Sequence, residues 1–170
     1  MLKSLKFNSR VWFFLGFLGC VFLLSMGAYF QFVQGLDPCP LCISQRIAIL
    51  LTGLVFLSAA IHNPGQAGMK AYAILGTVTA LCGAAISIRH VWIQHLPADK
   101  VPECGPGLEY VMQNFPLSET VKLMLSGTGD CAKVDWTMLG FSMPAWTLLA
   151  FLMLATLSVL QIWNYKEADR

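Results

Sequence analysis

The sequence predicts an all-α membrane protein: a four-transmembrane-helix bundle with one long loop that contains short amphipathic helices. Hydrophobic residues make up 56% of the 170-residue chain and charged residues only 12%, a balance too apolar for an ordinary soluble domain. The apolar residues fall into four runs, at about 11–33, 41–61, 71–88 and 143–163. Each run is close to the roughly 20 residues that cross a bilayer. We therefore expect a single membrane domain over residues 1–170.

The first run lies between Arg10 and Asp37 and carries no charge. A cleaved signal peptide has a shorter apolar region that ends in a small-residue cleavage site, and neither feature is evident here. We therefore expect the run to remain as a membrane-spanning helix.

The second run ends at a turn signal, Asn63-Pro64-Gly65, and the third begins soon afterwards. Such a short link predicts an antiparallel hairpin of two helices. The last run has Trp146 and Trp163 near its ends, where indole rings suit the two membrane interfaces. The connections at about 34–42 and 89–142 then lie on the same side of the membrane.

Basic residues predict the orientation of the bundle. They occupy the two short tails and the 62–70 turn, as Lys3, Lys6, Arg10, Lys70, Lys166 and Arg170. Short segments rich in Lys and Arg stay in the cytoplasm, whereas acidic residues outnumber basic ones in the long loop. We therefore expect both termini to be cytoplasmic and both loops to face the opposite compartment. The net charge of +2, without a dense basic cluster, gives no indication of nucleic-acid binding.

The long loop shows helical spacing of apolar residues at 108–115 and again at 117–125. Ser118 is the expected N-cap of the second helix, which could lie flat on the membrane. Its apolar face is better explained by packing or interface burial than by a ligand site. The glycine-rich stretch at 127–129 is expected to leave Cys131 mobile.

The chain has six cysteines, and two of them, Cys20 and Cys82, lie deep within apolar runs. Those two are expected to be small buried hydrophobic residues. The other four lie outside the runs or at their ends, and they are Cys39, Cys42, Cys104 and Cys131. Four cysteines make two pairs, and an oxidising compartment would permit a disulfide between the last two.

Cys39 and Cys42 form a Cys-x-x-Cys pair at the expected start of a helix, where the first N–H groups favour a thiolate. Arg46 follows Cys42 by one helical turn, inside the apolar run, and an ionisable group at such a position indicates a binding function. A structural zinc site is the alternative, but it needs a second closely spaced ligand pair, which the sequence lacks. Redox chemistry is therefore favoured, and no metal site is predicted.

Arg89 and His90 end the third apolar run at the level expected for Arg46. Two interpretations stay open for them, because basic residues commonly flank a helix end and also serve binding sites. Gln94 and His95 receive no role.

Four groups of residues carry a resemblance to a known family. They are Pro38-Cys39-Pro40-Leu41-Cys42-Ile43 with Arg46, then Cys104, then Gly129-Asp130-Cys131, and then Trp136-x-x-Leu139-Gly140-x-x-Met143-Pro144-x-Trp146. Together they resemble the DsbB family of disulfide bond formation proteins over nearly the whole chain. The resemblance implies an enzyme of the bacterial inner membrane that uses a quinone, ubiquinone or menaquinone, to reoxidise a periplasmic DsbA-like thiol oxidase.

The resemblance also implies roles for individual residues. Cys39 and Cys42 match the pair that exchanges electrons with the quinone, and Cys104 and Cys131 match the pair that meets the DsbA-like partner. Freed by the partner's attack, Cys131 would attack Cys39 and leave Cys42 as a thiolate.

The quinone site implied by the resemblance consists of Cys42, Arg46 and His90. Two alternatives stay open at this point. One is a membrane oxidoreductase of the vitamin K epoxide reductase type, although its Cys-x-x-Cys usually lies late in the chain. The other is a non-enzymatic four-span scaffold with structural disulfides.

Overall fold

Four long helices form the bundle in the computed structural model, which describes residues 9–103, 110 and 113–168. They are α1 (Ser9–Phe32), α2 (Pro40–His62), α3 (Gln66–Gln94) and α6 (Met143–Ala168). Each contains a segment long and apolar enough to cross a membrane. The predicted all-α fold with four membrane-spanning helices is therefore confirmed.

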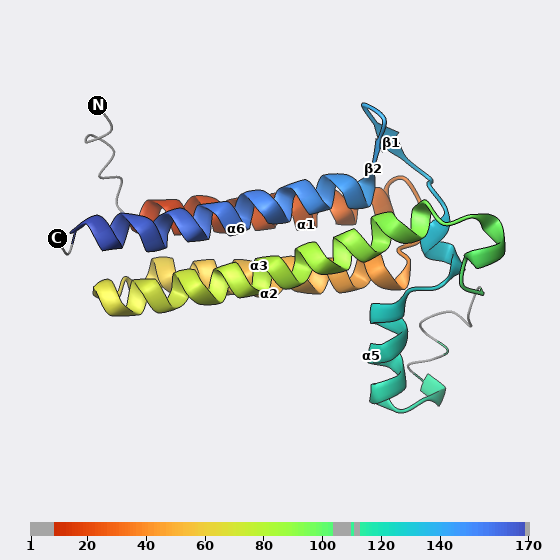
Figure 1. The fold of residues 1–170 in the computed structure, drawn as a ribbon, viewed down its shortest axis with the longest axis horizontal. Helices are drawn as coiled ribbons and strands as arrows, with labels where there is room; N and C mark the ends of the chain where they lie inside the picture. Colours follow the sequence, from red (N-terminus) through yellow and green to blue (C-terminus); the bar gives the residue numbers. More distant parts are fainter. Residues whose placement is uncertain (1–8, 104–109, 111–112, 169–170) are drawn as a thin grey trace.

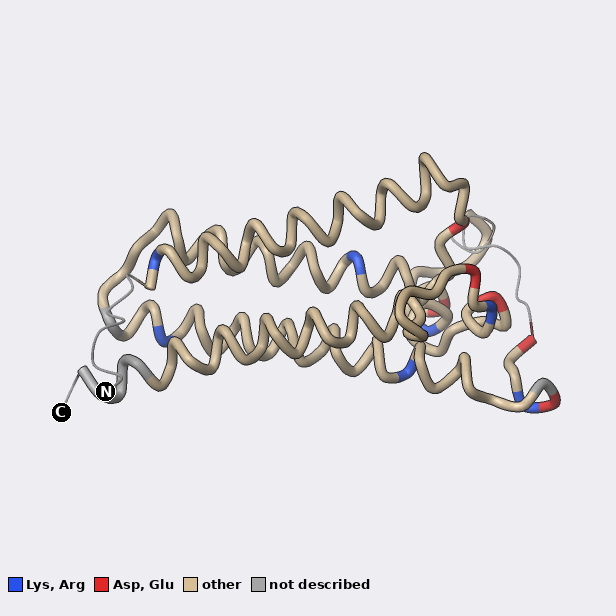
Figure 2. Tube along the Cα trace, turned by 90° about the horizontal axis from the view of Figure 1, so that it is seen from above, with Lys and Arg blue, Asp and Glu red and all other residues tan. Residues whose placement is uncertain are grey.

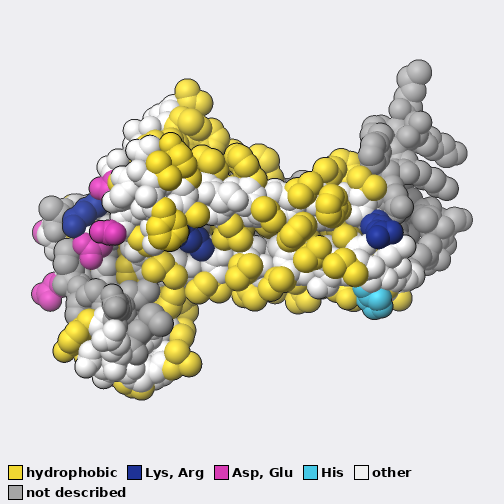
Figure 3. All heavy atoms as spheres, turned by 180° about the vertical axis from the view of Figure 1, so that it is seen from behind, with side chains coloured by type: hydrophobic (Ala, Val, Ile, Leu, Met, Phe, Trp, Pro, Cys, Tyr) yellow, Lys and Arg dark blue, Asp and Glu magenta, His cyan; other side chains and the backbone are white. Residues whose placement is uncertain are grey.

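The helices run side by side, with α3 packed on α6, α1 on α2 and α2 on α3 (Figure 1). Phe13, Phe56 and Phe151 are completely buried between them, and the rings of Phe13 and Phe56 lie 5.6 Å apart. Hydrophobic side chains also cover the outside of the bundle (Figure 3). An apolar exterior suits a bundle whose outer surface contacts the lipid of a membrane.

The third helix is longer than the apolar run that predicted it. It continues six residues past Ile88, so Arg89 and His90 lie within α3 and not at its end. Ile93 is fully buried and extends the packed face of the helix. The first proline after it, a residue that would interrupt the helix, is Pro97. Tertiary packing thus carries the helix beyond the hydrophobic stretch.

Short elements gather at the end of the bundle away from the termini (Figure 1). They are η1 (Ala98–Lys100), α5 (Leu117–Ser126), η2 (Gly129–Ala132) and an antiparallel hairpin of β1 (Thr137–Met138) and β2 (Phe141–Ser142). The predicted helix at 108–115 falls largely outside the described residues. Asp and Glu positions cluster at this end, as Figure 2 shows.

Helix α5 projects sideways from the end of the bundle instead of running along it (Figure 1). Its N-cap is Pro116, without a side-chain capping bond, so the prediction of Ser118 as N-cap is wrong. Pro116 already has the extended backbone that precedes a helix (φ −64°, ψ 151°), and its carbonyl accepts the N–H of Glu119. The helix therefore starts two residues earlier than the capping pattern indicated.

Two hydrogen bonds hold α5 against the bundle. The Ser44 hydroxyl of α2 donates to the carbonyl of Met124 at 2.9 Å, and the Arg89 guanidinium of α3 donates to the carbonyl of Ser126 at 3.2 Å. Gly127 follows with a φ of +78°, where a Cβ would lie 2.7 Å from Leu41. A residue without a side chain is therefore required where the chain turns from α5 towards η2.

Candidate active site

The Cys-x-x-Cys pair sits at the first turn of α2. Cys39 is the N-cap and its sulfur accepts the N–H of Cys42 at 3.4 Å, while Pro40 occupies the first turn. Proline suits that position because its missing N–H would be unpaired anyway. The two sulfurs lie 3.1 Å apart as thiols, one from the N-cap residue and the other from the first turn of the helix.

His90 approaches the pair from α3. Its Nε2 lies 3.7 Å from the Cys39 sulfur, and its Nδ1 lies 3.4 Å from the side-chain amide of Gln45. Both side chains are buried, with 2% of His90 and 4% of Gln45 exposed. Gln45 was not singled out from the sequence, although an amide in an apolar run, one residue before Arg46, is the type of signal that could have found it.

Cys131 reaches the same place from the loop. It is fully buried in η2 and packs with Leu41 and Ile93, and its thiol interacts with that of Cys39. The hydrogen bond from Cys39 lowers the pKa of Cys131 to about 6. The same bond raises the pKa of Cys39, and burial raises it further.

The burial of Cys131 differs from the sequence expectation of a mobile cysteine. Glycines at 127 and 129 permit a sharp turn, but the turn ends in a packed position and not in an open loop. Its expected partner, Cys104, lies outside the described residues. The structure therefore brings one cysteine of the outer pair into contact with the Cys39 and Cys42 pair.

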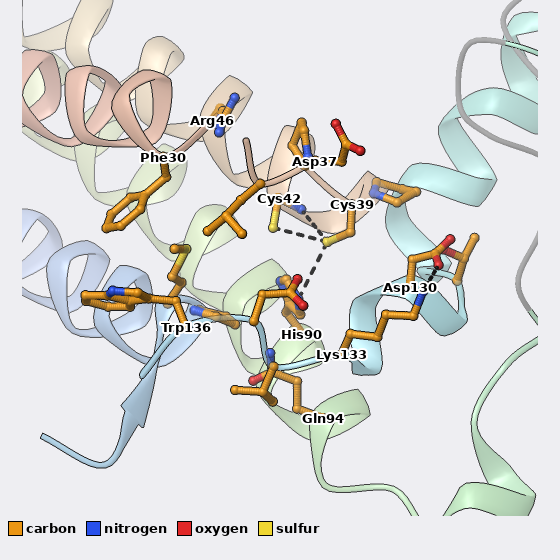
Figure 4. Close-up of a pocket in the computed structure, with 18 of the residues that line it drawn as sticks. Phe30, Asp37, Cys39, Cys42, Arg46, His90, Gln94, Asp130, Lys133 and Trp136 are labelled. Atoms are coloured by element: carbon orange, nitrogen blue, oxygen red, sulfur yellow. Dashed lines mark hydrogen bonds and ion pairs between the residues drawn. The ribbon is translucent and has the colours of Figure 1, made fainter. Parts of the chain in front are cut away.

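Arg46 points towards α1 from the next turn of α2 (Figure 4). Its guanidinium donates to the side-chain oxygen of Gln31 and, at 2.8 Å, to the carbonyl of Gly27. A Cβ at Gly27 would lie 3.1 Å from Arg46 Nε, so the glycine leaves room for this close approach. The end of α1 thus fixes a positive charge near Cys42.

A cavity of about 570 Å³ adjoins these groups, and Figure 4 shows it with the labelled side chains around it. Its wall includes Phe30, Cys39, Cys42, Arg46, His90, Gln94 and Trp136, together with residues 35–38 and 133–135. The rings of Phe30 and Trp136 lie 5.0 Å apart. Aromatic faces beside a guanidinium, an imidazole and a thiol fit a flat ring that carries two carbonyl oxygens, so the cavity is of a kind that suits a quinone head group.

Three other predicted positions have different outcomes. Arg89 anchors α5 through the Ser126 carbonyl and stacks on Trp92 at 4.9 Å, so its contacts are structural. Cys20 is buried as expected, with 1% exposed. Cys82 is exposed, and the prediction that it is buried is wrong because an apolar membrane helix turns part of its surface to lipid.

A bundle of membrane-spanning helices with clustered cysteines at one end defines the class of membrane thiol–disulfide proteins. The family described as "Disulfide bond formation protein DsbB" matches residues 9–161. The chain belongs to the DsbB family.

Similar proteins carry the name "Disulfide bond formation protein B". The one from Methylococcus capsulatus is 64% identical over 157 residues, which cover 92% of this chain and 96% of that protein. The one from Nitrosococcus oceani is 52% identical over 93% of this chain and 94% of its own length. The one from Hahella chejuensis is 56% identical over 85% and 88%. The chain is therefore a disulfide bond formation protein. The family match favours the DsbB family over the vitamin K epoxide reductase type that the sequence alone left open.

Proposed function

We propose that this protein is a quinone-dependent thiol:disulfide oxidoreductase that reoxidises a DsbA-like thiol oxidase. The packing of Cys39 against the buried cluster that contains Cys131 is the observation that supports it best. Cys131, one cysteine of the outer pair, lies more than eighty residues along the chain from Cys42 and yet packs beside the Cys39 and Cys42 pair, as a relay of disulfide exchanges requires.

The first exchange takes place at the outer pair. A thiolate of the reduced partner attacks Cys104 of a Cys104–Cys131 disulfide, forming a mixed disulfide and releasing Cys131 as the leaving thiolate. The Cys39 thiol, the largest cause that lowers the pKa of Cys131, is part of a disulfide at this step, but hydrogen bonds from the Leu41 backbone and from Thr128 also lower that pKa. They favour this direction because a thiol of lower pKa leaves faster.

The second exchange passes the electrons inward. Cys131 attacks Cys39 of a Cys39–Cys42 disulfide, so that a Cys131–Cys39 bond forms and Cys42 leaves as a thiolate. The partner's second thiol then resolves the mixed disulfide at Cys104, and Cys104 reforms its bond with Cys131 and releases Cys39. The net result is one disulfide in the partner and two reduced thiols at Cys39 and Cys42.

The quinone supplies the oxidising power, since it can take up the two electrons and two protons released when Cys39 and Cys42 pair again. Cys42, Arg46 and His90 are the residues that would hold it, because all three line the same cavity. The fixed charge of Arg46 favours an anionic sulfur one turn away and would also favour negative charge on a carbonyl oxygen. His90 stands 3.7 Å from Cys39, within reach to exchange a proton with that sulfur.

The proposed setting is the bacterial inner membrane, as a multi-pass protein with both termini in the cytoplasm and the cysteines facing the periplasm. Arg10 lies near the start of α1 and Lys70 near the start of α3, at the opposite end of the bundle from the start of α2 that carries the site, and these positions support this orientation.

The proposal is tested by mixing purified protein anaerobically with a reduced DsbA-like protein and either ubiquinone or menaquinone. We expect one partner disulfide per quinone reduced, followed by thiol trapping and quinone absorbance. Cys39→Ala, Cys42→Ala and Cys131→Ala should each stop turnover, whereas Cys82→Ala, at an exposed lipid-facing position, should retain it. Turnover without quinone, or full activity of Cys131→Ala, would contradict the relay.

A further inference from the structure

Three metal-ligating atoms converge at the start of α2. The Cys39 and Cys42 sulfurs and a ring nitrogen of His90 all lie within 4.8 Å of one another. The sequence predicted no metal site for want of a second closely spaced pair, but the third donor comes from α3, 51 residues after Cys39. Spacing along the chain cannot detect a ligand that the hairpin of two helices supplies.

The distances between these atoms are close to those of a tetrahedral site. Zn–S bonds of about 2.3 Å and Zn–N bonds of about 2.0 Å place neighbouring donor atoms roughly 3.5–3.8 Å apart. Here the two sulfurs are 3.1 Å apart and Cys39 Sγ is 3.7 Å from His90 Nε2. A slight increase in the distance between the two sulfurs would bring it to the tetrahedral value.

The groups around these three ligands also resemble those that surround metal ions in proteins. The Cys42 N–H supports the Cys39 sulfur, and the helix N-terminus favours negative charge on both thiolates. Gln45 holds the second nitrogen of His90, as an outer partner usually does for a metal-bound histidine. An amide can accept from or donate to that nitrogen, so it supports either tautomer.

We propose that the reduced protein binds one thiophilic divalent cation of the zinc class through Cys39, Cys42 and His90, with water in the fourth position. Binding replaces the two thiol protons with the metal and moves no electrons. When Cys39 and Cys42 form a disulfide, two of the three donors are consumed and the site no longer exists. The bound cation therefore keeps Cys39 and Cys42 from forming their disulfide, and a chelator that removes the cation lets the disulfide form again.

Cobalt(II) is the probe for the test. The full-length protein in detergent, reduced with a phosphine, is titrated with Co²⁺ and the visible spectrum is recorded, together with the same protein after oxidation of Cys39 and Cys42. We expect one tetrahedral, thiolate-coordinated Co²⁺ per reduced chain, displaced by Zn²⁺, and none in the oxidised chain. An octahedral spectrum, or equal binding by both redox forms, would overturn the proposal.

Matched variants identify the ligands. Cys42→Ala and His90→Ala should weaken Co²⁺ binding by roughly a hundredfold or more, and Gln45→Ala by about 10- to 100-fold, with Gln45→Glu restoring most of it. Cys131→Ala and Cys82→Ala should bind as the parent does. Loss in Cys131→Ala with retention in His90→Ala would overturn this assignment, and helical circular dichroism shows whether each variant is folded.

Discussion

Arg46 is a charged side chain within a membrane-spanning helix, and its charge is held by neutral groups of α1. Both partners, Gln31 and the Gly27 carbonyl, are hydrogen-bond acceptors without charge. Among the residues that the structure describes, no carboxylate forms an ion pair with the guanidinium, which keeps its positive charge at the cavity wall. An ion pair would have neutralised it, whereas here it remains available to an anionic sulfur or a carbonyl oxygen.

We expect Arg46→Ala to raise the quinone KM by about 10- to 100-fold, because a charge-assisted hydrogen bond is worth about 1.5–3 kcal/mol. Cys39 and Cys42 should still pair, since Arg46 contacts neither sulfur through a hydrogen bond. Steady-state kinetics at varied quinone concentration measure the first effect, and thiol trapping measures the second. An unchanged KM would remove Arg46 from the quinone site.

Gln31→Ala should have a smaller effect of the same kind, about a 3- to 10-fold rise in quinone KM. It removes one of the two acceptors that orient Arg46 and leaves the Gly27 carbonyl in place. Gln34→Ala is the matched control, because Gln34 donates to the Tyr29 hydroxyl instead. Equal kinetics for the two variants would show that Gln31 does not position Arg46.

Local spacing in the sequence predicts part of this site. The Cys-x-x-Cys pair and Arg46 lie within the first two turns of one helix and could be identified from the sequence alone. The roles of Gln31 and Gln45 could not, because each acts through a residue on another helix, although an amide within an apolar run could have marked Gln45 as a candidate. His90 was reached through the family resemblance, and its proximity to Cys39 depends on how α3 packs on α2.

At the scale of elements, α5 and the turn after it determine where Cys131 lies. The hydrogen bonds from Ser44 and Arg89 fix the end of α5 only a few residues before η2. Amphipathic spacing predicted α5, but it could not predict the burial of Cys131, because burial depends on Leu41 and Ile93 from two other helices. The glycines are compatible with a mobile loop and with a packed turn, and the contacts of Cys131 with Leu41 and Ile93 favour the packed turn.

We therefore expect Arg89→Ala to loosen the end of α5 and expose Cys131. The change removes both guanidinium donors from the Ser126 carbonyl, worth about 1–3 kcal/mol, so alkylation of Cys131 in the reduced protein should be roughly 5- to 100-fold faster. The rate is measured by maleimide labelling and mass spectrometry. Lys122→Ala, at an exposed position of α5, is the control, and equal rates would contradict the anchoring role.

At the scale of the whole molecule, close contact with α3 joins the last membrane-spanning helix, α6, to the rest of the bundle. Gly83 is the tightest point, because a Cβ there would lie 2.2 Å from the buried ring of Phe151. Gly83→Ala should therefore destabilise the bundle by about 1–3 kcal/mol, the usual cost of overpacking. Denaturation followed by helical circular dichroism measures it.

Gly19→Ala is the matched control for that change. Gly19 also lies in a membrane-spanning helix, but a Cβ there meets nothing within 4 Å. The substitution should be neutral or stabilise the protein by up to about 1 kcal/mol, since alanine favours helix more than glycine does. Equal destabilisation by the two variants would show that helix propensity, and not packing against Phe151, controls stability.

Helix length indicates that the bundle spans a membrane, and the charge distribution predicts its orientation. At about 1.5 Å per residue, the 24 residues of α1 extend roughly 36 Å, enough to cross a hydrocarbon core of about 30 Å. The turn after α2 and helix α5 must then lie on opposite faces of the membrane (Figure 1). In a variant without other cysteines, an impermeant maleimide added to intact spheroplasts should label Glu119→Cys and leave Asn63→Cys unlabelled until the membrane is opened. Labelling of Asn63→Cys alone would place the cysteine site on the reducing, cytoplasmic side, where disulfides are not maintained, and the proposed relay could not operate.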